Sequence, residues 1–344
     1  MIPDSTFLIP KLSPGFEATV TLPGSKSIAL RQLAIAALVE GTSHITGIPK
    51  CDDTDAMIDC LRALGVAIDE DTSGTRITGP MDFGSGHVEI NCRMSGASTR
   101  LLIALAALRN GSTRIDGHES LRVRTNAPLF EVLRDNGCDV TSDAGTLPAV
   151  IHGGLTSNGP LHIDGSLSSQ YITALTVIAP ILARRKALPT QGIHIHGDLV
   201  SRPYIDITLN EMGKRSVVGK WVDDTVLSLP AADYQPGEFF IEGDASAASY
   251  FLALATLHAG RVTLTKLDDT TVQGDYLFCD VMESLGATVE RQAQTRITGP
   301  KQLIPLRRID MQEMPDVALT LIAMSPLLAE PIEITALQSL PHKE

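Results

Sequence analysis

Aromatic residues are scarce in this chain. Phe, Trp and Tyr make up 4% of the 344 residues while hydrophobic residues reach 43%, so a core must be built mainly from Ala, Leu, Ile and Val. No apolar run reaches the roughly 18 residues of a membrane span, and MIPDSTFLIPKL lacks the charged and apolar regions of a signal peptide. We expect a cytoplasmic protein with no membrane partner, and the length suggests about two domains.

Signatures of disulfides and metal sites are missing as well. The five cysteines form no Cys-x-x-Cys pair and are odd in number, which favours reduced, buried thiols. The nine histidines contain no His-Glu-x-x-His; His194 and His196 alternate on a predicted strand, with no third ligand at suitable spacing. The acids of CDDTD, residues 51–55, are expected in the first turn of a helix without any ion. We therefore expect no metal site.

Positive charge is in the minority. A formal net charge of -12 at pH 7 argues against a nucleic-acid partner, because phosphates would be repelled over most of the surface. Basic residues nevertheless stand near predicted helix starts or turns, where they could converge on a small polyanionic ligand: Lys26, Arg31, Arg93, Arg100, Arg122 and Arg124. Unconnected surface arginines are the alternative interpretation.

The most informative feature that is present is a repeat. Alanine- and leucine-rich helical stretches, each followed by a small-residue turn and a β-branched strand, recur at a spacing of roughly 70 residues. They begin near Ser27, Ser98, Ser169, Ala248 and Val317. A second helix, a glycine turn and a strand follow in CLRALGVAI, VLRDNGCDV and VMESLGATV. In LNEMGKRSVVG this second half of the unit keeps the glycine but loses the spacing, and after the fifth stretch it is missing. The pattern predicts an α/β fold of repeated units that stops in mid-repeat.

Hydroxyl-rich turns precede three of these helices. LPGSKS (22–27) places Lys26 and two serines at a helix N-terminus, where free N–H groups attract anions, although it lacks the glycines of a P-loop. A serine N-cap would explain the hydroxyls without a ligand, but Lys26 opposes the helix dipole and needs a compensating partner. SGASTR (95–100) and GSLSSQ (165–170) occupy the corresponding places, with plain capping as the alternative for the second. Equivalent helix ends in a repeat fold can face one cleft.

On these residues the chain resembles the 5-enolpyruvylshikimate-3-phosphate (EPSP) synthases, enolpyruvyl transferases of the shikimate pathway. The matching stretches run from end to end: LPGSKSIALR, SGASTRLL, ESLRVRTNAPL, GSLSSQYITAL, DLVSRPYIDITLNEM, EGDASAASYFLA, MPDVALTLIA and HKE. The resemblance implies transfer of the enolpyruvyl group of phosphoenolpyruvate to the 5-hydroxyl of shikimate 3-phosphate, with release of phosphate and without metal or organic cofactor. Chorismate and aromatic amino-acid biosynthesis would be the context.

The resemblance also implies a two-domain enolpyruvyl transferase fold that works as a monomer. Repeated βαβαββ-like units would surround approximate threefold axes, with the last repeat incomplete. Residues 22–242 would form the domain with most shikimate 3-phosphate contacts, and residues 1–21 plus 243–344 would form the second, shortened domain. The hinge crossings would lie near residues 20–22 and 242–244, and both ligands would bind between the domains.

Site residues carry over from the family motif by motif. Shikimate 3-phosphate would contact Lys26, Ser27, Arg31, Ser168, Ser169, Gln170, Ser201, Tyr204, Asp316, Ser339 and Lys343. Phosphoenolpyruvate would contact Lys26, Gly96, Arg124 and Gln170. Asp316 matches the base for the attacking hydroxyl, with helix capping as its alternative role. Glu344 matches the acid that protonates the methylene carbon, helped by Lys26.

Some positions depart from the family pattern. Ala97 replaces a threonine, Leu101 and Thr125 each replace a proline, and Ser339 replaces an asparagine. The arginines and the lysine that finish the family's phosphoenolpyruvate pocket would lie beyond Glu344. Two alternative functions therefore stay open: a relative that binds shikimate 3-phosphate without catalysis, and an enolpyruvyl transferase for another alcohol.

Overall fold

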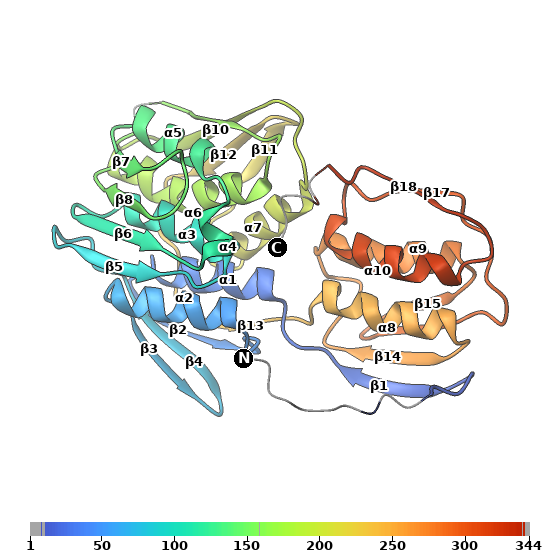
Figure 1. The fold of residues 1–344 in the computed structure, drawn as a ribbon. Helices are drawn as coiled ribbons and strands as arrows, with labels where there is room; N and C mark the ends of the chain where they lie inside the picture. Colours follow the sequence, from blue (N-terminus) through green and yellow to red (C-terminus); the bar gives the residue numbers. More distant parts are fainter. Residues whose placement is uncertain (1–7, 9–10, 158, 339, 341–344) are drawn as a thin grey trace.

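The computed structural model describes residues 8, 11–157, 159–338 and 340, and these form two lobes (Figure 1). The first lobe has its own core of buried, mainly aliphatic residues drawn from positions 28–241. The second lobe buries a separate cluster that combines Leu22 with positions 245–324. No helix in the described part of the chain is long and apolar enough to cross a membrane.

Four sheets share one plan, in which the first strand pairs in parallel with the second and two further strands add antiparallel. The first lobe contains β13 (Glu238–Phe240), β2 (Gly41–Thr46), β4 (Gly74–Gly79), β3 (Ala67–Asp71); β5 (Val88–Asn91), β6 (Ser112–Asp116), β8 (Ala149–His152), β7 (Asp139–Ser142); and β9 (Leu161–Asp164), β10 (Thr190–His196), β12 (Val226–Pro230), β11 (Lys220–Asp223). The second lobe contains β1 (Glu17–Thr21), β14 (Arg261–Thr265), β16 (Thr295–Thr298), β15 (Thr288–Arg291). A parallel pair, β17 (Arg308–Asp310) with β18 (Glu333–Thr335), begins a fifth copy.

Helices connect the partner strands in three of the parallel pairs, β5–β6, β9–β10 and β17–β18, as a parallel crossover requires. In the pairs β1–β14 and β13–β2 the partner strands come from distant parts of the chain. The predicted helix starts lie close to those of α1 (Lys26–Ala36), α3 (Gly96–Ala107), α6 (Ser169–Arg185), α8 (Ala245–Leu257) and α10 (Ala318–Met324). The second half-unit supplies α2 (Asp52–Ala63), α5 (Ala127–Asp135), α7 (Pro203–Gly213) and α9 (Phe278–Ser284); short turns are α4 (Glu119–Arg122) and the 3-10 helices η1 (Gly274–Leu277), η2 (Pro315–Val317) and η3 (Ser325–Leu327). The βαβαββ order confirms the predicted fold class.

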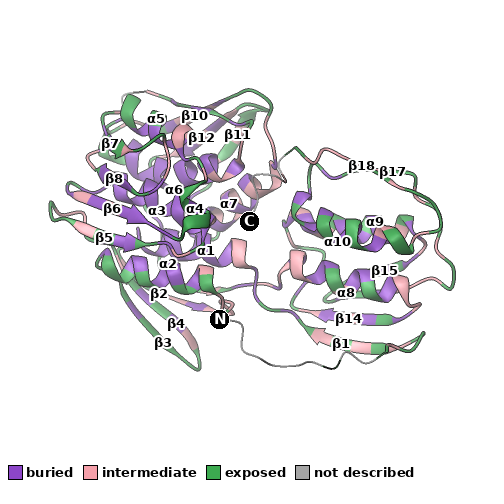
Figure 2. Cartoon of the chain, in the orientation of Figure 1, coloured by how far each residue is buried: buried purple, intermediate pink, exposed green. Residues whose placement is uncertain are grey.

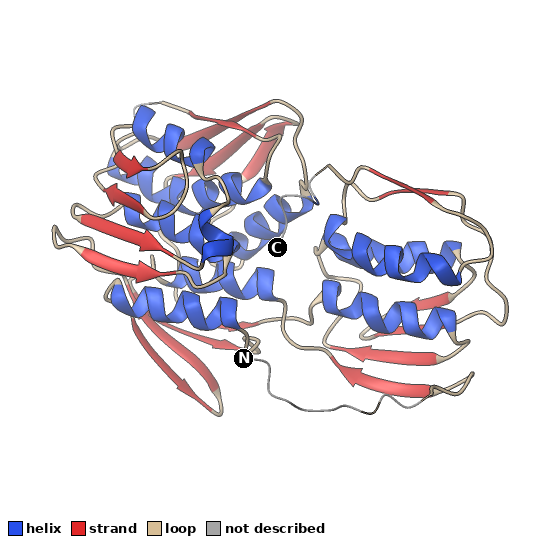
Figure 3. Ribbon diagram, in the orientation of Figure 1, coloured by secondary structure: helices blue, strands red, loops and turns tan. Residues whose placement is uncertain are grey.

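The long helices of the first lobe are buried on nearly all sides. α1, α3 and α6 lie in the middle of the lobe with its sheets at the periphery (Figure 3), and they are mostly buried (Figure 2). Apolar residues occur on every side of these helices, which is typical of a helix with packing partners on every face. Alanines such as Ala104 and Ala106 allow the close packing of α3.

The chain crosses between the lobes twice, and each crossing exchanges a strand. β1 precedes the first lobe in sequence but pairs with β14 of the second, whereas β13 follows the first lobe's other strands and pairs with β2. The two crossing segments run side by side: Gly24 and Gly243 form an antiparallel bridge, and Ser25 N donates to Glu242 O at 2.8 Å. The junction is therefore a paired two-segment connection. The domain boundaries at residues 22 and 242 stay a prediction.

We expect Gly24→Ala to destabilise this junction. A Cβ at position 24 would lie 1.9 Å from the Gly47 carbonyl oxygen, a backbone atom of the segment that directly follows β2. Forcing such an overlap costs about 1–3 kcal/mol, so the free energy of unfolding should fall by roughly 2 kcal/mol in denaturant titrations. Gly86→Ala is the matched control, because a Cβ there meets nothing within 4 Å. Equal stability of the two variants would contradict the tight junction.

Candidate active site

Lys26 opens α1 where the chain enters the first lobe. Ser25 occupies the N-cap position, but its side chain makes no capping bond; the Lys26 backbone N–H donates instead to Asp244 Oδ2 at 3.1 Å. The Lys26 ammonium nitrogen lies 3.4 Å from Asp53 Oδ2. The serine-cap interpretation is therefore wrong at this helix. The lysine at the positive end of the helix dipole has the compensating carboxylates that the sequence required.

Asp53 joins the starts of two helices. It lies in the first turn of α2, as predicted, but Cys51 and Thr54 form the capping box there. Its carboxylate accepts the Ser95 hydroxyl at 2.5 Å, and Ser95 is the N-cap of α3, directly before the buried Gly96. The N-termini of α1 and α3, and with them Lys26 and Gly96, therefore meet around one carboxylate.

The start of α6 carries the third hydroxyl cluster. Ser168 is its N-cap and accepts the Gln170 N–H at 3.2 Å, so capping accounts for this serine. Ser169 and Gln170 lie in the first turn; Ser169 is buried and Gln170 is half-buried. A helix start that adds a hydroxyl and a carboxamide to its free N–H groups can still bind an anion.

Arg124 lies in a loop that α3 and α6 hold together. Tyr171 of α6 donates its hydroxyl to the Thr125 carbonyl at 2.8 Å, and Arg100 of α3 donates to the same oxygen at 3.3 Å. Because this carbonyl belongs to the residue after Arg124, both helices fix the backbone that presents the Arg124 side chain. Arg124 itself is half-buried.

Arg31 is a buried side chain that links α1 to α7 in this structure. Its side chain is 6% exposed, and its guanidinium donates to Thr208 Oγ1 at 2.8 Å, to the Tyr204 carbonyl at 2.9 Å and to the Ser27 carbonyl at 2.7 Å. Burial lowers the pKa of Arg31 to about 10, although Glu211 opposes the shift. Arg31 thus fixes α7 against α1, and a contact with shikimate 3-phosphate stays a prediction.

The two lobes meet at the start of α7. The Tyr204 hydroxyl oxygen lies 2.5 Å from Asp316 Oδ2 and 3.2 Å from Asp275 Oδ1. Asp275 belongs to η1, is 4% exposed and also accepts the Ser246 hydroxyl. Burial raises the pKa of Tyr204 well above its usual value, and both carboxylates add to the shift. Asp316 thus makes a contact between the lobes, which a capping role alone does not require.

Ser201 prepares this contact from the first lobe. It is buried and has a backbone φ of 57°. The Tyr204 N–H donates to the Ser201 carbonyl oxygen, with 3.2 Å between N and O. A left-handed backbone is costly for a residue with a side chain and persists where the surroundings enforce it, often at functional sites. The strained turn therefore sets the direction in which α7 presents Tyr204.

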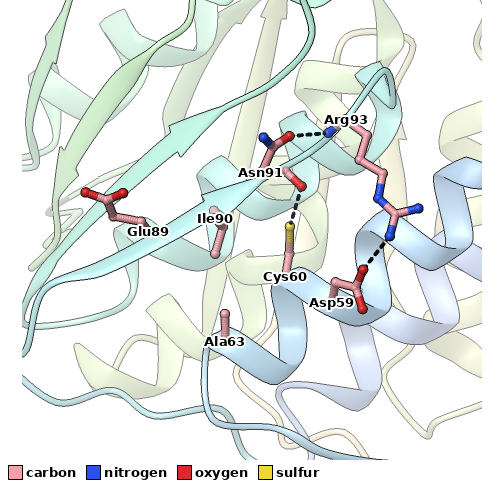
Figure 4. Close-up of a pocket in the computed structure, with 7 residues that line it drawn as sticks. All are labelled: Asp59, Cys60, Ala63, Glu89, Ile90, Asn91 and Arg93. Atoms are coloured by element: carbon pink, nitrogen blue, oxygen red, sulfur yellow. Dashed lines mark hydrogen bonds and ion pairs between the residues drawn. The ribbon is translucent and has the colours of Figure 1, made fainter.

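Two of the predicted basic residues, Arg93 and Arg122, form ion pairs with nearby acids. Arg93 Nη1 lies 2.9 Å from Asp52 Oδ1 and Nη2 lies 2.5 Å from Asp59 Oδ2. It lines a separate surface pocket of about 310 Å³ (Figure 4), together with Asp59, Cys60, Ala63, Glu89, Ile90 and Asn91. Arg93 is thus paired with acids of α2, and its convergence with the other basic residues stays a prediction. Arg122 is likewise engaged by Asp116, at 2.9 Å.

The remaining histidines and cysteines form no metal site among the residues that the structure describes. His162 Nδ1 lies 3.0 Å from His196 Nε2, a neighbour that only strand pairing could reveal. Among the residues that the structure describes, no group of three or more His, Cys, Asp or Glu side chains could hold a metal ion. All five cysteines are free thiols. Ser339, Lys343 and Glu344 lie outside the described residues.

A family model for EPSP synthase (3-phosphoshikimate 1-carboxyvinyltransferase) matches residues 13–344. The chain belongs to the EPSP synthase family.

Individual members of the EPSP synthase family cover the chain to different extents. The chain is 40% identical over 277 residues to the 3-phosphoshikimate 1-carboxyvinyltransferase of Bordetella bronchiseptica, a match that covers 78% of this chain but 62% of the relative. The corresponding protein of Trichormus variabilis is 32% identical over 346 residues, covering 98% of this chain and 80% of the relative. The fold resembles a structure of EPSP synthase from Acinetobacter baumannii, with a TM-score of 0.73, 22% identity and coverage of 94% and 74%. The chain thus spans less than two thirds of the Bordetella relative's length.

Three acidic residues in this EPSP synthase family member escaped motif analysis as members of the site. The sequence places Asp53 at a helix start and indicates no role for Asp244 or Asp275. Their partners, Ser95, Lys26 and Tyr204, lie 42, 218 and 71 residues away along the chain. The one usable signal was Lys26 itself, since a cation at a helix N-terminus demands nearby carboxylates.

Proposed function

We propose that this protein transfers the enolpyruvyl group of phosphoenolpyruvate to the 5-hydroxyl of shikimate 3-phosphate and releases phosphate. The observation that carries the proposal is the 2.5 Å contact between Tyr204 of the first lobe and Asp316 of the second. It brings the expected base next to an expected shikimate 3-phosphate contact, at the meeting point of the lobes. Membership of the EPSP synthase family supports the same reaction.

The helix starts supply the anion contacts in this proposal. Lys26 and Gly96, expected at phosphoenolpyruvate, belong to two helix N-termini that Asp53 joins, and free N–H groups at such ends favour phosphate. Arg124 offers a planar guanidinium that can pair with two oxygens of a phosphate or carboxylate. Ser168, Ser169 and Gln170 would bind shikimate 3-phosphate from the start of α6.

The reaction is an addition followed by an elimination. Asp316 would accept the proton of the 5-hydroxyl as its oxygen attacks phosphoenolpyruvate, and an acid must protonate the methylene carbon. We assign that acid to Glu344, helped by Lys26. Loss of phosphate then requires the same carbon to return a proton.

Domain organisation is part of the proposal. Residues 22–242 would form one domain, and residues 1–21 with 243–344 the other, because the two lobes have separate cores and are joined by the paired crossing segments. We further propose that the protein acts as a monomer in the cytoplasm, a reducing compartment in which five free thiols are stable.

Phosphate release tests the proposal directly. It should appear when both substrates are present and not with either alone, and calorimetry should detect shikimate 3-phosphate binding without phosphoenolpyruvate. Binding without phosphate release would favour a non-catalytic relative instead. Release that is faster with unphosphorylated shikimate than with shikimate 3-phosphate would favour another acceptor alcohol. The absence of both binding heat and phosphate release at millimolar ligand would overturn the proposal.

Lys26→Ala and Arg124→Ala should each impair the use of phosphoenolpyruvate. Removing one partner of a desolvated charge pair costs about 2 kcal/mol or more. The activation free energy derived from kcat/KM for phosphoenolpyruvate should therefore rise by at least that amount in each variant. Arg184→Ala is the control, because Arg184 pairs with Asp233 on the surface and both side chains are about half exposed. Unchanged constants in both test variants would refute the assignment.

A further inference from the structure

We propose that Asp275 is a positioning residue that serves as the second acceptor of the Tyr204 hydroxyl, so that Asp316 is freed to act as the base. The proposal rests on the proposed function, because it concerns the base of that reaction. It assigns a role to a buried carboxylate that the motifs did not single out.

The observation is one phenolic hydroxyl between two carboxylates. Tyr204 Oη lies 2.5 Å from Asp316 Oδ2, and 3.2 and 3.4 Å from the two oxygens of Asp275. A phenol carries a single proton and donates it to one acceptor at full strength. In the structure the short contact gives that proton to Asp316. A rotation about the C–O bond would redirect it to Asp275 without moving the ring.

This arrangement matters because an occupied carboxylate is a poor base. A hydrogen bond to the ionised form stabilises that form, so Asp316 binds a further proton less readily while Tyr204 donates to it. When the 5-hydroxyl of the substrate reaches Asp316, the Tyr204 hydroxyl must leave. A buried hydroxyl left without an acceptor is costly, and Asp275 removes that cost.

Asp275 is held where this exchange requires it. Ser246 donates its hydroxyl to Asp275 Oδ2, and the side chain is 4% exposed. η1 also lies tightly against the start of α7, because a Cβ on Gly274 would stand 2.6 Å from Pro203 Cβ. The spacing between Asp275 and Tyr204 is therefore fixed by backbone packing. In the exchange the phenol keeps its proton and changes only its acceptor, while the proton of the 5-hydroxyl passes to Asp316.

Kinetics of a variant set test the role. At saturating substrates, Asp275→Ala should lower kcat at least about tenfold with a much smaller change in KM for shikimate 3-phosphate, the pattern of a group that acts after binding. Asp275→Asn keeps an acceptor oxygen and should recover part of the rate. In the Tyr204→Phe background, Asp275→Ala should change kcat less than about twofold, because residues that act through one another are not additive. An equal loss in both backgrounds would indicate a structural role and overturn the proposal.

A spectroscopic measurement separates this inference from the proposed function. The short hydrogen bond should give a strongly downfield phenolic proton in the NMR spectrum, absent in Tyr204→Phe and retained in Asp275→Ala. Adding shikimate 3-phosphate alone should move it upfield in the wild type, since the bond to Asp275 is longer, and should not produce that shift in Asp275→Ala. A shift without phosphate release would count against the transfer reaction only. Phosphate release with an unmoved resonance would overturn only the role of Asp275.

Discussion

Replacing Asp316 with asparagine should lower the rate of phosphate release at saturating substrates by at least about 10²-fold, the lower end of what a general base contributes. The amide has nearly the same shape and can still accept the Tyr204 hydroxyl that lies 2.5 Å away. It cannot take up the proton of the 5-hydroxyl at neutral pH. We therefore expect a large loss in kcat and a small change in the affinity for shikimate 3-phosphate, measured by calorimetry.

Asp310→Asn provides the matched control for this prediction. Asp310 is an exposed carboxylate of the same lobe that accepts the Gln312 N–H at 2.8 Å in a local turn. Its replacement should leave phosphate release within about twofold of the wild type, as expected of a surface change away from special features. Wild-type turnover in Asp316→Asn, with an unchanged unfolding temperature, would remove Asp316 from the role of base.

The repeated unit was predictable because its hydrophobic pattern is local. Each long helix corresponds to one continuous Ala- and Leu-rich stretch, and each strand follows a glycine or small-residue turn. The order of the elements could therefore be derived from the sequence. The exchange of β1 and β13 between the lobes could not. β1 pairs with residues 261–265, far away along the chain, and nothing within its five residues specifies that partner.

The sequence could propose the residues of the candidate site but not the contacts between them. The motifs pointed to Lys26, Gly96 and Tyr204, and the requirement for a carboxylate near Lys26 followed from the helix dipole. Which carboxylate meets this requirement depends on packing between repeat units. That packing places Asp53 and Asp244 next to Lys26. The same packing pairs Arg93 with Asp52 and Asp59 of α2, partners that the sequence did not indicate.

Arg215→Met should lower the free energy of unfolding by about 3–5 kcal/mol, the cost of removing one member of a buried charged network. Arg215 is 0% exposed, and its guanidinium donates to Gln32 Oε1 at 2.7 Å and to Ser43 Oγ at 2.8 Å. The guanidinium carbon also lies 3.8 Å from the centre of the Phe239 ring. Methionine fills much of the volume of the arginine side chain. The loss of unfolding free energy therefore comes mainly from polar partners left without a hydrogen bond, and less from a cavity.

The position of Arg215 makes this stability effect relevant to the site. It follows α7 and ties that helix to α1, β2 and β13, so α7, which presents Tyr204 at its other end, depends on it. Burial lowers the pKa of Arg215 to about 10, against the attraction of Glu211, so the guanidinium stays charged at neutral pH. Urea titration of Arg215→Met beside Arg184→Met, whose surface ion pair should contribute less than about 1 kcal/mol, checks the difference. Similar losses in the two variants would mean that the buried network does not hold α7 in place.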